Sequence, residues 1–158
     1  MSAGLGDESG LVLFAYDGSD LAGHAITEAG RQLQAGRDAL VLTIWEPFNV
    51  GFLPVGGTGF DAAGPDEVRA AAEKTAAYGA SLAEAAGFRA KTLTAEAAPT
   101  WKGIIDAADS RDASLIVLGS HGRSGVTSLV VGSVASAVAA HSRRSVLIVH
   151  HRQEPAEA

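Results

Sequence analysis

Short apolar runs separated by amphipathic stretches limit what this chain can fold into more than any other feature. The runs are Leu11–Tyr16, Ala39–Trp45, Phe88–Glu96, Leu115–Leu118 and Val146–Val149. A continuously apolar run of this length is typical of a strand that is buried on both faces. Phe88–Glu96 instead alternates polar and apolar residues, which indicates an edge strand with one exposed face.

Helical patterns fill the intervals between these runs. Leu21, Ala25, Ala29 and Leu33 recur every four residues, Ser19 or Asp20 is suited to cap the helix, and Gly36 to end it. Three further helices are predicted: one over residues 65–86, one that starts at Pro99, and one over residues 133–141. Gly87 is suited to end the first of them. Strands and helices that alternate in this way predict a parallel sheet covered by helices on both faces. We therefore predict an α/β fold with an open, doubly wound, five-stranded parallel sheet. The chain of 158 residues is expected to form a single domain, because domains usually contain about 100–200 residues.

Composition excludes several classes of function. The chain contains no cysteine, so disulfide scaffolds and thiolate metal sites are ruled out. Its formal net charge is -6, which argues against binding nucleic acid or an anionic membrane. Residues 124–142 are uncharged when His141 is neutral, but serine, threonine and glycine make them too polar for a membrane span. We expect a cytoplasmic protein without a secretory signal, because residues 1–10 carry no lysine or arginine.

The 19 glycines are concentrated at positions that suggest different roles. Those in residues 47–64 accompany two prolines and predict a long flexible loop. Gly119, Gly122 and Gly132 instead follow the spacing G-x2-G-x9-G-S, which ends where a helix begins. Glycine allows a positive φ and lets backbone N–H groups approach an anion, and the start of a helix favours a phosphate group. The alternative interpretation is that these glycines only form a turn and allow close helix packing.

Two further residues follow strands at the edge of the sheet where ligands bind. Asp17 ends the first strand and could accept hydrogen bonds from ribose hydroxyls, or it could cap the next helix. Ile44 ends the second strand and could line an apolar slot for adenine, or it could belong to the ordinary core. His24, His141, His150 and His151 form no recognisable metal-ligand pattern. Arg143 and Arg144 are interpreted as a solvated helix end.

From Leu11 to His150, the chain resembles a universal stress protein of the ATP-binding subgroup. The resemblance rests on Ala15–Ser19, Leu118–Gly125, Gly132–Ala135 and Ser145–Val149, and the G-x2-G-x9-G-S spacing is typical of that subgroup. It implies a domain over residues 11–150 with strand order 3-2-1-4-5, with flexible tails over residues 1–10 and 151–158. It also implies a homodimer that forms through the last strand, Val146–Val149.

The resemblance further implies ATP as the ligand, with ADP or AMP as alternatives and magnesium beside the phosphates. The implied contact residues are Ala15, Tyr16, Asp17, Ile44, Leu118, Gly119, Ser120, His121, Gly122, Arg123, Gly132, Ser133 and Val134. Neither a catalytic residue nor a metal ligand is expected among them.

The predicted function is a nucleotide-dependent sensor or interaction module of the stress response, which signals to an unidentified protein partner. The alternative is a slow ATPase, or an enzyme that phosphorylates itself at Ser124, Thr127 or Ser128. A phosphoacceptor receiver domain shares the alternating architecture, but it needs an acidic pair after the first strand and an aspartate after the third. The chain has Gly18 and Ser19 after Asp17, and only Glu96 in the second place.

Overall fold

The computed structural model describes residues 10–46, 64–122 and 131–151, and nine elements alternate along them as predicted. The strands are β1 (Leu11–Ala15), β2 (Asp38–Trp45), β3 (Arg89–Glu96), β4 (Ala113–Gly119) and β5 (Ser145–Val149). The helices are α1 (Asp20–Gln32), α2 (Pro65–Ala85), α3 (Thr100–Ser110) and α4 (Ser133–His141). The predicted tails and the predicted loop over residues 47–64 lie almost entirely outside the described residues.

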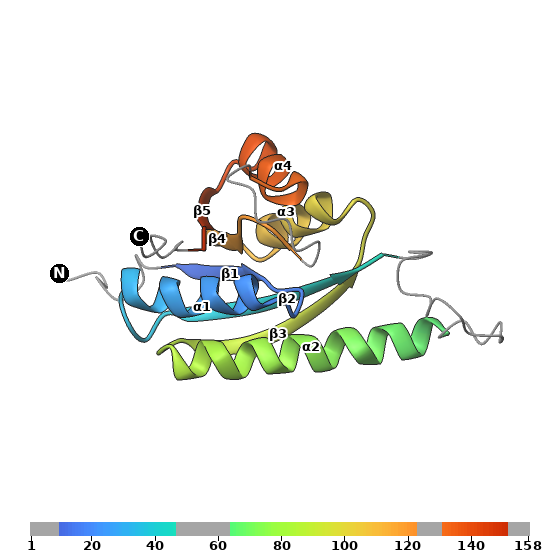
Figure 1. Ribbon diagram of the computed structural model, residues 1–158, viewed down its shortest axis with the longest axis horizontal. Helices are drawn as coiled ribbons and strands as arrows, with labels where there is room; N and C mark the ends of the chain where they lie inside the picture. The colour runs from blue at the N-terminus through green and yellow to red at the C-terminus, as the bar shows by residue number, and fades with distance from the viewer. Residues whose placement is uncertain (1–9, 47–63, 123–130, 152–158) are drawn as a thin grey trace, which may run out of the picture.

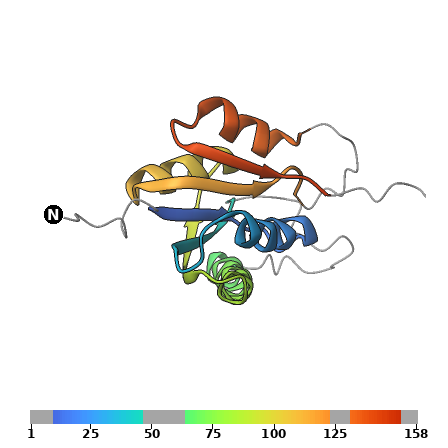
Figure 2. The same cartoon turned by 90° about the vertical axis from the view of Figure 1, so that its left-hand side faces the viewer.

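The strands form a five-stranded sheet in the order β3-β2-β1-β4-β5, and all four neighbouring pairs are parallel. Helices α1 and α2 cover one face of the sheet, and α3 and α4 cover the other (Figure 1, Figure 2). The predicted doubly wound fold and its strand order are therefore confirmed. β2 lies on one side of β1 and β4 on the other, so the strand order reverses between β1 and β4. Open sheets of this kind bind ligands at the point of reversal.

Two hydrophobic cores lie on the two faces of the sheet because strand side chains alternate in direction. Val12 and Phe14 belong to the core beneath α1 and α2, where the Phe14 ring meets the edge of Phe88 with centroids 5.2 Å apart. Leu13 and Ile116 belong to the core beneath α3 and α4. Both faces of β1 are thus buried, which explains its continuously apolar sequence.

Helix ends follow the local signals with one exception. The Ser19 hydroxyl oxygen accepts a hydrogen bond from the Ala22 N–H at 3.2 Å, so Ser19 caps α1 and Asp20 is its first residue. Gly87 has a φ of +100° after α2, and the next N–H, that of Phe88, donates to the Ala83 carbonyl at 3.0 Å. The prediction that Gly36 ends α1 was wrong. The helix ends at Gln32, and Gly36 takes its φ of +85° in the turn that leads to β2.

Arg144 corrects a second expectation, because it joins α3 to the sheet and is not a solvated helix end. Its Nε donates to Asp109 at 3.1 Å, and its Nη1 donates to Asp112 at 2.9 Å and to the Ala113 carbonyl at 2.7 Å. The hydrogen bonds to Asp112 and then to Asp109 raise the pKa of the Arg144 guanidinium above its ordinary value.

Within the ranges that the structure covers, no helix combines the length and apolar character needed to cross a membrane.

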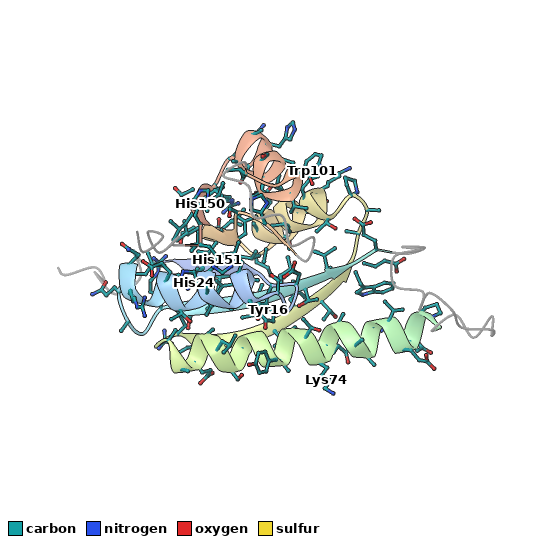
Figure 3. The ribbon with its side chains drawn as sticks, viewed as in Figure 1. Tyr16, His24, Lys74, Trp101, His150 and His151 are labelled. Atoms are coloured by element: carbon teal, nitrogen blue, oxygen red, sulfur yellow. The ribbon has the colours of Figure 1, made fainter. Side chains whose placement is uncertain are left out.

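Close packing of α2 against the sheet yields a test of the fold. A Cβ atom on Gly79 would lie 2.6 Å from Cδ1 of the buried Tyr16 (Figure 3) and 2.8 Å from Cγ1 of Val41. We predict that Gly79→Ala lowers the free energy of unfolding by about 1–2 kcal/mol, because overpacking outweighs the gain in helix propensity. Urea denaturation measures the change.

Gly23→Ala in α1 is the matched control. A Cβ atom there would meet only Cδ1 of Leu82, at 3.3 Å, and that methyl group can rotate away. We expect this variant to stay within about 1 kcal/mol of the wild-type protein, or to be more stable. Equal losses for both glycines would contradict the proposed packing of α2.

Candidate functional site

A cavity of about 700 Å³ opens where β1, β2 and β4 end, at the reversal of the strand order. Its walls come from the residues after β1 and β4, the end of β2, one side of α2, and the starts of α3 and α4. Twelve of the predicted site residues line it: Ala15, Tyr16, Asp17, Ile44, Leu118, Gly119, Ser120, His121, Gly122, Gly132, Ser133 and Val134. Arg123 and the serines and threonine considered for self-phosphorylation lie outside the described residues. The structure thus brings the described candidates together, while their contacts with a ligand stay predictions.

Hydrogen bonds to β2 hold the backbone that follows β1. The Tyr16 N–H donates to the Leu42 carbonyl at 2.9 Å, and the Thr43 hydroxyl donates to the Tyr16 carbonyl at 2.8 Å. The next residue, Asp17, accepts a hydrogen bond from the Ser19 N–H at Oδ1, at 2.9 Å. Asp17 is therefore not the cap of α1, since Ser19 has that role. Its carboxylate is instead positioned at the cavity.

The loop after β4 is joined to two other elements through the buried residue Ser120. The Ser120 N–H donates to the Val149 carbonyl in β5 at 2.9 Å. The Ser120 carbonyl accepts from the Gly132 N–H at 2.6 Å, directly before α4. The loop and the start of α4 therefore meet at one side of the cavity, although residues 123–130 separate them in the sequence.

Gly119, Gly122 and Gly132 allow close approach of neighbouring segments, and the positive φ expected at Gly119 and Gly122 is not found. Positive φ occurs instead at Gly18, among other described glycines outside this motif. A Cβ atom would lie 2.9 Å from Cγ of Leu21 at Gly119, 2.8 Å from Asp17 Oδ2 at Gly122, and 2.9 Å from the Ser120 carbonyl oxygen at Gly132. Hydrogen in place of a side chain thus lets the loop lie against β1, α1 and α4 at once.

The start of α4 offers backbone N–H groups to the cavity. Gly132 is the N-cap residue and, lacking a side chain, supplies no capping hydrogen bond. The first N–H groups of a helix have no partner within the helix, and together with the helix dipole they attract anions. Ser133 and Val134 occupy these positions and line the cavity. This end of the cavity is suited to a phosphate group.

The end of β2 forms a second wall, against α3. Ile44 packs on the core and also lines the cavity, while its contact with a base stays a prediction. Gly103 makes this packing close, because a Cβ atom there would lie 3.0 Å from Cδ1 of Ile44. Glu46 accepts hydrogen bonds at Oε1 from the Thr100 N–H at 3.1 Å and the Thr100 hydroxyl at 2.7 Å. Trp45, Glu46 and Thr100 also line the cavity. Trp45 and Glu46 fall in the segment at the end of the second strand where a ligand was expected, but none of the three was among the predicted contact residues.

Sequence reasoning also missed the wall that α2 provides. This wall consists of Glu67, Val68, Ala71, Ala72 and Thr75. Val68, Ala71, Ala72 and Thr75 follow the i, i+3, i+4, i+7 spacing of one helix face. That spacing was a usable signal for an inward face, but it does not indicate whether the face meets a sheet or a cavity.

The electrostatics of the cavity are unusual for an anion site. The titratable side chains in its described lining are Asp17, Glu46, Glu67, His121 and the Tyr16 phenol, without lysine or arginine. Any phosphate held there by the described residues must rely on backbone N–H groups, hydroxyls and the His121 imidazole. Across the described ranges, no group of three or more histidine or acidic residues is arranged to hold a metal ion.

Comparison with known proteins identifies relatives of the chain. The sequence profile of the universal stress protein family matches residues 10–150. A universal stress protein of Mycolicibacterium smegmatis is 30% identical over 145 residues, which cover 89% of this chain and 46% of the relative. The chain therefore spans about half the length of this curated relative.

Solved structures share the fold. A universal stress protein in complex with cAMP is 25% identical, with a TM-score of 0.62, and the match covers 90% of this chain and 98% of that one. The universal stress protein from Archaeoglobus fulgidus in complex with dAMP is 20% identical, with a TM-score of 0.57 and coverage of 88% and 95%. The second likeness is one of fold alone.

Proposed function

The chain belongs to the universal stress protein family, and we propose that it is a stress-response regulatory protein that binds ATP in the cavity beyond β1, β2 and β4. The observation that carries this proposal is the contact between Ser120 and Gly132, which brings a glycine loop and a helix start to one side of the cavity. The neighbours solved with cAMP and dAMP support an adenine nucleotide in general. ADP and AMP are the alternatives to ATP.

The phosphates would lie along the loop and the start of α4. Backbone N–H groups of Gly122, Ser133 and Val134 would donate to the phosphates, together with the exposed Ser133 hydroxyl. Arg123 would add a positive charge, on the basis of family resemblance. Magnesium would be held mainly by phosphate oxygens and water, because the described residues offer no acidic cage.

The nucleoside would occupy the remaining part of the cavity. The Asp17 carboxylate would accept hydrogen bonds from ribose hydroxyls. The base would lie near Ala15 and Ile44, in the slot that continues along β2 toward α2. ATP would thus connect the ends of three strands with two helices.

We favour a binding module over an enzyme. Phosphoryl transfer needs a positioned nucleophile and charge stabilisation beside the transferred group. The described lining contains His121 but no lysine or arginine. Slow hydrolysis or self-phosphorylation remains the alternative at the same site.

We also propose that the protein forms a homodimer through β5. This strand is at the edge of the sheet, and Val146, Leu147 and Ile148 are only half-buried. A groove of about 900 Å³ lies between β5 and α1. Glu28 lines this groove and accepts hydrogen bonds from the side chains of Gln32 and Arg31, which lower its pKa. His24 and His151 stack at this edge with centroids 5.9 Å apart, beside the exposed His150 (Figure 3). An unpaired apolar edge favours pairing with a second copy.

The nucleotide proposal predicts a thermal shift that depends on Gly132. ATP with magnesium, at about a hundredfold excess over its Kd, should raise the Tm of the wild-type protein by about 5–10 °C. Gly132→Val should abolish this shift, because the side chain would displace the Ser120 carbonyl. Differential scanning fluorimetry measures the shift, and chromatography after denaturation detects copurified adenine nucleotide.

Gly64→Val is the matched control, since Gly64 is the N-cap residue of α2 with similar dihedral angles and open space around it. It should keep the full shift. If Gly132→Val does not fold, Gly122→Ala supplies the second test and should also reduce the thermal shift. This variant is expected to fold, because its Cβ atom would meet only the Asp17 carboxylate. A wild-type protein with neither copurified nucleotide nor a thermal shift would refute the proposal.

The dimer proposal predicts that charge at the β5 edge weakens association. Leu147→Lys should raise the dimer dissociation constant at least about tenfold, because a lysine on an edge strand opposes pairing. Thr92→Lys, on the exposed edge strand β3, should leave it unchanged. Analytical ultracentrifugation measures both, with circular dichroism as a check of folding. A monomeric wild-type protein at every concentration tested would contradict the proposed dimer.

A further inference from the structure

Glu46 combines two properties that the proposed nucleotide site does not yet use. It directly follows β2, and it lines the cavity. Its hydrogen bonds from the Thr100 N–H and the Thr100 hydroxyl both end on the same oxygen, Oε1. Within the described part of the chain, no hydrogen bond reaches Oε2. One oxygen therefore fixes the carboxylate, and the other is available to a ligand.

The partner that fixes Glu46 is itself firmly placed. Thr100 is the first residue of α3, and the N-cap residue Pro99 provides no side-chain hydrogen bond, so Glu46 acts as the cap. Trp101 (Figure 3), the next residue, stacks on His141 of α4 with ring centroids 4.7 Å apart. The first turn of α3 is thus held against α4, and the carboxylate at its start is held with it.

Glu46 also continues the wall that begins at Ile44. Residues two apart on a strand face the same side, about 7 Å from each other. Ile44 approaches Gly103 of α3, and Glu46 binds Thr100, one helical turn earlier on the same helix. A base that lies on Ile44 would therefore have an edge directed toward Glu46.

We propose that Glu46 reads the 6-position of a purine base and selects 6-amino over 6-oxo nucleotides. This inference rests on the proposed nucleotide-binding function and specifies its substrate class. An ionised carboxylate only accepts hydrogen bonds, so an oxygen that lies at the 6-substituent and away from N1 binds the amino group of adenine and repels the carbonyl oxygen of hypoxanthine or guanine. A helix cap alone accounts for Oε1, but it would not produce any preference between bases.

Comparison of ATP with inosine triphosphate tests this role, because the two differ only around the 6-position. Isothermal titration calorimetry should give the wild-type protein an affinity for ATP that is about 10–100-fold higher, the value of one hydrogen bond to a charged group. In Glu46→Gln, the amide oxygen can still cap α3 while the amide nitrogen donates to a 6-oxo group. The preference for ATP should disappear or reverse in this variant.

Two further variants separate base reading from folding. Glu46→Ala should lose both the cap and the preference, with a lower Tm. Glu96→Gln makes the same change of charge at the β3 residue that pairs with Trp45, outside the cavity lining, and should keep the full preference. Because each result is a ratio of two affinities in one protein, a general loss of stability does not alter it.

The outcomes distinguish this inference from the proposal on which it rests. Equal wild-type affinities for the two nucleotides, or a preference that Glu46→Gln leaves unchanged, would overturn the role of Glu46 and leave ATP binding intact. A folded wild-type protein that binds neither nucleotide would overturn the proposed function itself.

Discussion

The contact between Gly132 and Ser120 is the constraint on which the rest of the site depends. The hydrogen bond from the Gly132 N–H to the Ser120 carbonyl is 2.6 Å long, and the Ser120 N–H in turn binds β5. Together they hold β4, β5 and α4 in one arrangement at the carboxyl end of the sheet. A Cβ atom on Gly132 would enter the space of that carbonyl, so a single hydrogen atom in place of a side chain allows the arrangement.

This constraint resolves an apparent conflict between the charge of the chain and its proposed ligand. The net charge is -6, and the described residues around the cavity include carboxylates but no lysine or arginine. Oriented backbone N–H groups hold anions through local partial charges, which do not depend on the net charge of the protein. In the proposed complex, the carboxylates at the same cavity would bind polar groups of the nucleoside, Asp17 those of the ribose and Glu46 that of the base.

The fold was predictable because its signals are local, whereas parts of the site depend on contacts between distant segments. Apolar runs revealed the strands, and Gly87 marked the end of α2 through the conformation that its own backbone adopts. The positions of Gly119, Gly122 and Gly132 were found, and close packing was one of the two reasons considered for them. Their partners Leu21, Asp17 and Ser120 could not be identified, because they lie across the fold. The wall from α2, the cap from Glu46 and the clamp by Arg144 were missed for the same reason: each requires knowing which segments meet.

The most direct test of a backbone-held phosphate is a comparison of ATP with adenosine by two-dimensional amide NMR spectroscopy. If the account is right, ATP shifts the N–H signals of Gly119–Gly122, Ser133 and Val134, whereas adenosine shifts signals near Ile44 and leaves those of Ser133 and Val134 in place. Saturable shifts confined to the groove between α1 and β5, or equal shifts at Ser133 and Val134 with both ligands, would contradict it.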